Sequence, residues 1–549
     1  MNTQFETLDY LIFGAYAVLI LGVGLWVSRN KKGHVKNTED YFLAGKSLPW
    51  WAIGASLIAA NISAEQFIGM SGSGFALGLA IASYEWMAAI TLIIVGKYFL
   101  PIFIEKGLYT IPEFVEKRFS TNLKTILAVF WIALYIFVNL TSVLYLGSLA
   151  LETIMGIPMI YGVIGLGLFA AAYSLYGGLA AVAWTDVIQV IFLVMGGLVT
   201  TYLALNTVSG GEGVIEGFKT IYERAPERFT MILDKSNPYY DMLPGIAVIV
   251  GGMWVANLYY WGFNQYIIQR TLAAKSLRES QKGIMLAAFL KLIIPLIVVI
   301  PGIAAYVMVN DPSIMAQLGD TAQHNLPTLE QADKAYPWLL QFLPVGLKGV
   351  AFAALAAAIV SSLASMLNST STIFTMDIYK PYINKSASSS ALVKVGRLTA
   401  AAALIIACII APLLSGLDQA FQFIQEYTGM VSPGILAVFL LGLFWKKTTN
   451  RAAIIGALAS IPIAFYFKVA PNGWSDSAFF VDLPFMDQMG LTCLLTMLII
   501  AILSWKEGKG KDDEKGIVIS KGFFKTSPSF NIAAFAVLII LTALYAYFW

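Results

Sequence analysis

The stretch WWAIGASLIAANISAEQFIGMSG, residues 50–72, decides the fold because it places polar groups in the middle of an apolar run. A membrane helix needs about 20 mostly apolar residues, and this stretch is long enough to be one. On a regular helix in lipid, Asn61, Ser63, Glu65 and Gln66 would each be costly to bury without a partner. We therefore expect the helix to break here and to turn these side chains towards protein or water.

A second stretch, GGMWVANLYYWGFNQ at residues 251–265, has the same character. Four uninterrupted apolar spans separate the two stretches, so each stretch begins a set of five spans. Because five is odd, the two sets enter the membrane from opposite sides. Paired interrupted segments in an inverted repeat indicate the binding site of a secondary transporter. The alternative is that Gly and Asn here merely permit close helix packing.

The composition requires lipid as the main solvent. Of the 549 residues, 58% are hydrophobic and only 12% are charged, whereas a typical soluble domain has about 25% charged residues. The mean hydropathy is +0.74. The apolar runs predict an all-α membrane protein with about 14 transmembrane helices. These runs lie at roughly 9–28, 50–72, 78–104, 124–153, 158–176, 181–206, 243–266, 283–309, 347–376, 395–415, 419–444, 452–468, 485–504 and 531–549.

Basic residues concentrate in alternate loops. Most of the 35 Lys and Arg residues fall on one side of the expected spans, and cytoplasmic loops accumulate such residues. The opposite loops, chiefly 207–242 and 310–348, hold few of them. We therefore expect a multi-pass protein of the cell membrane, a single transmembrane domain over 1–549, with both termini outside. The basic segments are 29–46, 97–124, 270–282, 380–397, 446–451 and 506–525.

Signals for other classes of protein are weak. Two His and two Cys residues give no His-based site and no CxxC spacing. The glycine-rich run at 72–78 follows a membrane segment rather than a strand, which argues against a nucleotide loop. No Walker-type motif occurs, which argues against ATP-driven transport. We expect neither an enzyme nor a nucleic-acid partner, and a transport-like sensor is disfavoured because the loops are short.

Several motifs together resemble the sodium/solute symporter family, and most closely its bacterial sodium/galactose members. Any one of the motifs is weak, but their order and spacing are specific. They are YFLAGKSLPWW at 41–51, AANISAEQF at 59–67, YSLYGGL at 173–179, WTDVIQ at 184–189, QR at 269–270, SSLASMLN at 361–368 and SPG at 432–434.

The resemblance implies a five-plus-five inverted repeat, the LeuT-like fold. One helix, 9–28, would precede the core, and additional helices over 452–549 would follow it. The first repeat would cover 50–206 and the second 243–444.

Sodium is a hard cation that prefers oxygen ligands. Ala358, Ser361 and Ser362 follow the i, i+3, i+4 spacing and so share one helix face. The resemblance implies a sodium site made by the carbonyls of Ala59, Ile62 and Ala358 and the hydroxyls of Ser361 and Ser362. The alternative is that both serines bond back to their own helix.

By the same resemblance, Asp186 lies on the cytoplasmic side of the sodium path. Its alternative role is that of a structural partner for a cation such as Arg270.

Two opposite charges lie inside expected spans, where charges are expensive and usually functional. Glu85 and Lys291 could neutralise each other and, with amides such as Gln66, form a neutral site rich in donors and acceptors. Such a site suits a polyhydroxylated solute. Neighbouring aromatic rings could pack on a sugar, although a membrane aromatic is more often a packing residue.

The resemblance implies a role for each of these residues. Gln66, Glu85, Asn257 and Lys291 would contact a sugar, with Asn139 and the Gln425 backbone nearby. Met70, Tyr84 and Phe421 would form an outer gate, and Tyr260 with Trp261 an inner gate in which Tyr260 bonds to Asn61. One departure is Ala88, where a close member of the family has a serine that bonds to the sugar.

These features predict sodium-coupled symport of a neutral sugar, galactose or glucose, into the cell by alternating access. Ala88 leaves the preferred hexose open, and the sequence leaves sodium stoichiometry, affinity and oligomeric state open. The alternatives are another solute on the same fold, such as proline, inositol or a vitamin, and proton coupling through Glu85 or Asp186.

Overall fold

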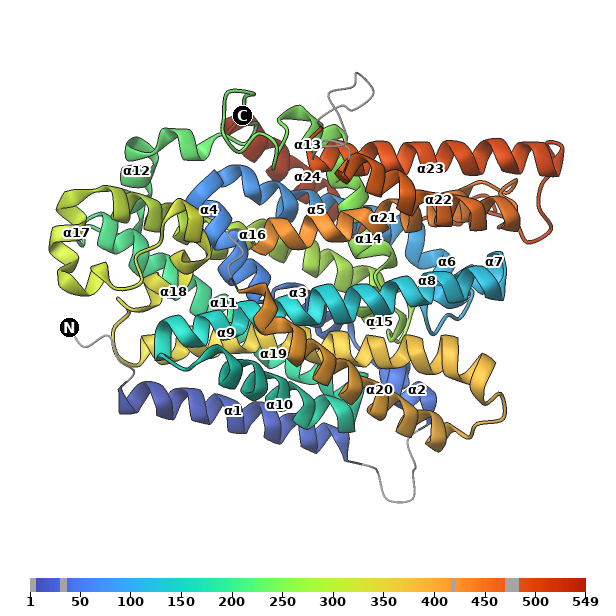
Figure 1. Cartoon of the computed structure of the whole chain (residues 1–549), viewed down its shortest axis with the longest axis horizontal. Coiled ribbons are helices and arrows are strands. Elements are labelled where there is room, and N and C mark those ends of the chain that lie inside the picture. The colour runs from blue at the N-terminus through green and yellow to red at the C-terminus, as the bar shows by residue number, and fades with distance from the viewer. Residues whose placement is uncertain (1–5, 30–36, 416–419, 470–482) are drawn as a thin grey trace.

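The computed structural model describes residues 6–29, 37–415, 420–469 and 483–549, and these residues are almost entirely helical (Figure 1). Three basic residues of the segment 29–46 lie outside the described residues, namely Lys31, Lys32 and Lys36. The first residue of the expected span 419–444 lies outside them as well. The all-α expectation is confirmed for the described part of the chain.

Eleven helices in the described residues are long and apolar enough to cross a membrane. They coincide with eleven of the expected spans. They are Thr7–Ser28 (α1), Leu79–Glu105 (η3 to α6), Thr121–Met155 (α8, η5 and α9), Leu179–Val208 (α11), Leu277–Asn310 (α16), Leu347–Ile383 (α19 and η9), Ser389–Leu414 (α20 and η10), Phe421–Phe444 (within α21, Ala420–Phe444), Asn450–Lys468 (within α22, Asn450–Val469), Phe485–Gly508 (α23) and Pro528–Tyr547 (α24).

Of the other three expected spans, one is a further helix and two are interrupted. The span 158–176 corresponds to α10, Met159–Gly177. The span 50–72 is divided into α3, Trp50–Asn61, the π-helical turn η2, Glu65–Met70, and α4, Ser71–Leu77. The break expected at the polar cluster is therefore confirmed.

The span 243–266 is interrupted at two points. It consists of α13, Ile246–Val250, α14, Gly252–Phe263, and α15, Gln265–Leu272. Asn257 therefore lies on a regular helix, and the breaks lie at Gly251 and Asn264. At the second break the Tyr135 hydroxyl donates to the Asn264 side chain and accepts the amide of Gln265 at 2.9 Å. A side chain from a neighbouring helix thus provides the bonds that the interrupted helix lacks.

The interrupted segments lie among enclosed helices. In the most apolar stretch of Leu347–Ile383, 94% of the residues are buried, whereas in that of α1 only 22% are buried. The helix α19 packs along α11, and α3 packs against both α11 and α16 (Figure 1). The centre of the molecule is therefore built of α3, α11, α16 and α19, and α1 lies at its margin.

The basic segments meet at one end of the molecule. Arg118 pairs with Asp513 at 3.2 Å, and the Lys515 ammonium donates to the Phe119 carbonyl at 2.8 Å. Figure 1 shows the short helices α2, Thr38–Leu43, and α7, Ile111–Arg118, at this end. The helices of the opposite loops, α12, Val214–Arg224, and α17, Pro312–Leu318, lie at the other end.

The first and last described helices, α1 and α24, contact the loops 310–348 and 207–242 respectively. The Asp9 carboxylate accepts the amides of Gly346 and Gly349, each at 2.8 Å. The amide of Met231 donates to the Phe548 carbonyl at 2.8 Å. The start of α1 and the end of α24 therefore share one end of the molecule, opposite the basic segments.

Candidate functional site

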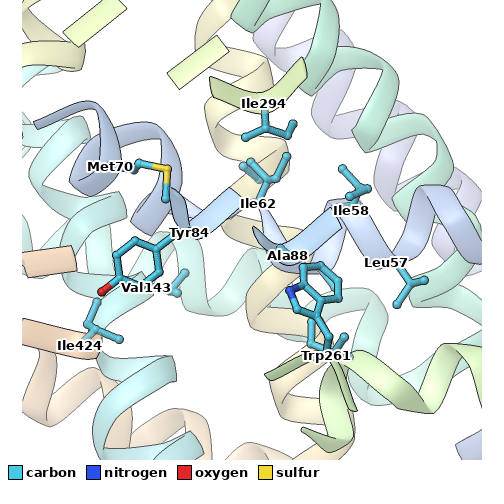
Figure 2. Packing of buried hydrophobic residues seen from close by; sticks show 14 of the residues in the cluster. Leu57, Ile58, Ile62, Met70, Tyr84, Ala88, Val143, Trp261, Ile294 and Ile424 are labelled. Atoms are coloured by element: carbon cyan, nitrogen blue, oxygen red, sulfur yellow. The ribbon is translucent and has the colours of Figure 1, made fainter. Parts of the chain in front are cut away.

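A cavity of about 50 Å³ lies where the two interrupted segments meet, with room for a few water molecules. Ala88 and Trp261, two of the buried residues labelled in Figure 2, line it. The cavity is lined by Asn61, Glu65, Gln66, Tyr84, Glu85, Ala88, Ala256, Asn257, Tyr259, Tyr260, Trp261, Lys291, Phe421, Gln425, Thr428, Gly429, Ser432 and Met489.

The structure brings together most of the solute and gate residues named from the sequence. Two of them are not part of the cavity wall. Asn139 is buried in η5, Leu134–Leu140, and Met70 is buried at the end of η2. The roles expected for these two residues therefore stay predictions.

The break after α3 is stabilised by its own polar residues. The amide and the hydroxyl of Ser63 donate to Gln66 Oε1, at 2.9 and 3.1 Å. The amide of Glu65 in turn donates to the Ser63 hydroxyl at 3.0 Å. Reciprocal bonds of this kind cap a helix start, so the chain can begin a new helical turn one residue after the break.

The same bonds free two carbonyls. In a continuous helix the Ser63 amide would donate to the Ala59 carbonyl and the Gln66 amide to the Ile62 carbonyl. Instead, Ser63 donates to Gln66, and the Gln66 amide donates to the Ser63 carbonyl at 3.2 Å. Ala59 and Ile62 therefore each lose the helical donor, and these are two of the three carbonyls expected to bind sodium.

The Glu85 carboxylate and the Lys291 ammonium form a buried ion pair in the cavity wall. Lys291 also donates to the Asn61 side-chain oxygen and lies 5.0 Å from the Trp261 ring centre. A buried charge is tolerated when it is paired and hydrogen-bonded. The pair expected from the sequence is present, and it adds no net charge to the cavity.

On the side of the expected inner gate, the Tyr260 hydroxyl accepts bonds from the Asn61 amide at 3.0 Å and the Tyr266 hydroxyl at 2.8 Å. The Tyr260 ring contacts Trp261, with centres 5.2 Å apart. This network ties the broken end of α3 to α14.

At the expected outer gate, the Tyr84 and Phe421 rings meet edge to face, with centres 5.1 Å apart. Gly69 lies against Phe421, and a Cβ on Gly69 would come within 2.9 Å of the Phe421 Cβ. Only a glycine lets η2 approach α21 this closely, so the aromatic pair closes against the broken helix.

The two serines of α19 bond to other helices. Ser362 donates to the Ala60 carbonyl at 3.0 Å, and Ser361 donates to the Asp186 carboxylate at 2.5 Å. By contrast, Ser365 bonds back to the Ser361 carbonyl of its own helix at 2.7 Å. The back-bonding alternative for Ser361 and Ser362 is therefore wrong. Both hydroxyls are directed to the region of the freed carbonyls and of Asp186.

Asp186 forms an ion pair with Arg270 at 3.3 Å, and both residues are fully buried. Ser56 donates to Asp186 and accepts the Arg270 Nε at 2.5 Å, and Arg270 also donates to Ser365. The structural partner considered for Asp186 is confirmed. Arg270, counted above among the cytoplasmic basic residues, is correspondingly enclosed by α3, α11, α15 and α19.

Sequence reasoning missed some of the cavity wall. Ser432 belongs to a motif noted above, and its hydroxyl donates to Met489 at 3.7 Å. Thr428 lies one helical turn before Ser432, a spacing that could have indicated a shared face. Met489 comes from α23, outside the expected repeats, and one methionine in an apolar helix carries no signal of its own.

Known proteins resemble the chain over nearly its whole length. The model of the sodium:solute symporter family matches residues 41–460. The chain is 68% identical over 542 residues to the sodium/glucose cotransporter of Vibrio parahaemolyticus, covering 99% of this chain and 98% of that protein. It is 33% identical over 540 residues to the sodium/myo-inositol cotransporter of Bos taurus, covering 92% and 74%.

Among solved structures, the chain resembles a Na⁺-coupled sialic acid symporter in a substrate-bound outward-open state. The TM-score is 0.78, with 91% of this chain and 98% of that chain covered. At 24% sequence identity this likeness concerns the fold.

Proposed function

Because the chain belongs to the sodium:solute symporter family, we propose that it carries a neutral hexose, glucose or galactose, into the cell together with sodium. The observation that carries this proposal is the neutral Glu85–Lys291 pair set among amides, hydroxyls and aromatic rings in one cavity. A relative 68% identical is named for glucose, which supports the same class of solute.

The architecture we propose is a core of two inverted repeats of five helices, 50–206 and 243–444, with 9–28 before it and three helices over 452–549 after it. Eleven uninterrupted spans, the two interrupted segments and α10 together make fourteen. The two interrupted segments begin the two repeats and line the same cavity, which is the arrangement expected of a secondary transporter.

Sodium would bind beside the break in α3. Its ligands would be the carbonyls of Ala59, Ile62 and Ala358 and the hydroxyls of Ser361 and Ser362. Two observations support this site: the carbonyls of Ala59 and Ile62 have lost their helical donors, and the two serine hydroxyls bond to other helices. The Ser361 bond to Asp186 supports a path from the site towards the basic end of the molecule, with Asp186 as the first polar group along it.

The hexose would lie between the two gates. Gln66, Asn257 and the Glu85–Lys291 pair would bond its hydroxyls, with Gln425 beside them. Each hydroxyl needs a partner once water is removed. Because Ala88 contributes no hydroxyl, one contact is missing, which costs roughly 1 kcal/mol. Such a cost changes the preference among hexoses without excluding any of them.

Transport would proceed by alternating access. Sodium holds the broken end of α3, and through Asn61 that end is bonded to both Lys291 and Tyr260. Sodium binding thereby orders one sugar contact and one gate contact together, so the two ligands bind with positive coupling. Sodium loss to the cytoplasm would loosen the Asn61–Tyr260 bond and release the sugar. The chain would lie in the cell membrane with both termini outside.

The test is uptake of radiolabelled glucose and galactose into proteoliposomes, with and without an inward sodium gradient. We expect sodium-dependent accumulation, and we expect Gln66→Ala to raise the half-saturating hexose concentration about tenfold or more. The matched control is Gln341→Ala, a buried glutamine outside the cavity.

Two other results would overturn parts of the proposal. Sodium-dependent uptake of proline, myo-inositol or a vitamin, without hexose uptake, would support sodium coupling but show that the solute is not a hexose. Uptake driven by a proton gradient in sodium-free medium would reject the sodium coupling and point to Glu85 or Asp186.

A further inference from the structure

Glu65 is a buried carboxylate in the cavity wall to which the proposed function gives no task. The side chain is only 7% exposed and lines the cavity. Its Oε1 has no hydrogen-bond partner among the described residues. A buried acceptor without a donor is costly, and an ionised one more so. Water or a donor group of a solute in the cavity could supply the missing bond.

The backbone fixes Glu65 in this position. Its amide donates to the Ser63 hydroxyl at 3.0 Å, and the residue starts the turn η2. The neighbouring Gln66 is engaged differently, because its Oε1 already accepts two bonds from Ser63. Of these two side chains, Glu65 therefore has the free acceptor.

The two carboxyl groups of the cavity wall have one cation between them. Among the lining residues, all of which the structure describes, the carboxylates are Glu65 and Glu85 and the one cation is Lys291. Lys291 is committed to Glu85 and to Asn61. Glu65 is left without a cationic partner among the lining residues, and a ligand that carries one positive charge would supply one.

We propose that Glu65 is a subsite for a donor group of the solute that favours an ammonium over a hydroxyl, so that the cavity accepts aminohexoses as well as neutral hexoses. A carboxylate takes a hydroxyl donor, but the bond to a charged ammonium is stronger. This inference rests on the proposed function, because the amino group replaces one hydroxyl of the same sugar ring.

The first experiment uses the unmodified protein. Glucose, its 2-amino, 3-amino and 6-amino derivatives, and the N-acetylated derivatives compete with sodium-dependent uptake of labelled glucose at pH 6, where an amine is protonated. We expect at least one aminohexose to bind about tenfold more tightly than glucose and its N-acetylated form to lose that advantage. If no amino derivative binds more tightly than its parent, the proposal is wrong.

The second experiment compares two charge-neutralising variants. Glu65→Gln should abolish the advantage of the aminohexose over glucose. Glu426→Gln, which removes a carboxylate beside Gln425 that pairs with Lys468 outside the cavity wall, should preserve it. An advantage that survives Glu65→Gln assigns the amine to another residue and overturns the proposal.

Failure of the proposed function gives a different result. If labelled glucose and galactose are not accumulated with sodium at all, the hexose proposal fails. Direct accumulation of a labelled aminohexose, with and without Glu65→Gln, then tests the subsite independently.

Discussion

Ser361 and Ser362 are adjacent, yet their hydroxyls bond to different helices. Ser362 reaches the Ala60 carbonyl next to the break in α3, whereas Ser361 reaches Asp186 on α11. If both are sodium ligands, Ser362 has the smaller structural role, since its partner is a single backbone carbonyl. It is therefore the better position at which to test the sodium site.

We expect Ser362→Ala to raise the sodium concentration for half-maximal uptake about tenfold, because one oxygen ligand of a hard cation is lost. The measurement is the sodium dependence of hexose uptake in proteoliposomes at saturating hexose. The matched control is Thr370→Val on the same helix, whose hydroxyl bonds back to the Met366 carbonyl at 2.8 Å. Equal sodium dependence in Ser362→Ala and the unmodified protein would remove Ser362 from the site.

At this scale, the sequence allowed prediction of residues that are costly to bury. Polar side chains inside apolar spans are costly and usually functional, which drew attention to Glu85, Lys291 and Gln66. Ser56 and Met489 could not be predicted, because a lone serine or methionine in a helix is ordinary. Asn139 and Met70 were assigned by resemblance; both are buried and neither lines the cavity, so their roles stay predictions.

Four elements converge on the Asp186–Arg270 pair. Asp186 lies on α11, Arg270 on α15, Ser56 on α3 and Ser365 on α19. The pair therefore links the broken helix to the helix that carries the two serines. Removing one charge leaves the other buried without compensation, which costs several kcal/mol.

We expect Asp186→Asn to lower the free energy of unfolding in detergent by about 3–5 kcal/mol. Arg270→Gln should have a similar effect, and the double variant should recover part of the loss because no uncompensated charge remains. The control is Glu216→Gln, which breaks an exposed pair with Lys219 and should cost at most about 1 kcal/mol. Fully additive losses in the double variant would mean that the two residues do not stabilise each other.

Among the elements, the first interruption was predictable and the details of the second were not. The polar side chains at 61–66 would lack hydrogen-bond partners on a lipid-facing helix, so the cost of burying them predicts a break there. The second break depends on the Tyr135 hydroxyl, which comes from another helix and bonds at Asn264 and Gln265. Periodicity within one segment cannot report such a partner.

The whole molecule has two chemically different ends. The basic segments contact one another at one end, whereas Asp9 and Phe548 bring both chain ends to the loops 207–242 and 310–348 at the other. Charge counting along the sequence predicted this separation, because a wrong number of spans would have mixed the two sets of loops. The same tendency of basic residues to accumulate in cytoplasmic loops predicts that the basic end faces the cytoplasm.

That orientation leads to a labelling prediction. In a background with Cys408 and Cys493 replaced by alanine, single cysteines at Ser236, Ser386 and Trp549 probe three exposed positions. A membrane-impermeant maleimide should label Ser236→Cys and Trp549→Cys in intact cells and Ser386→Cys only after permeabilisation, because Ser386 lies within the basic segment 380–397. Hexose uptake by each variant controls for correct folding.

The reverse pattern, with only Ser386→Cys labelled in intact cells, would invert the molecule in the membrane. Sodium leaving past Asp186 would then face the outside, and the transport direction argued from the basic end would be wrong. Labelling of Ser236→Cys but not Trp549→Cys in intact cells would instead separate the two ends of the chain. Because α24 would then have to cross the membrane differently, that result would contradict the contact between Met231 and Phe548.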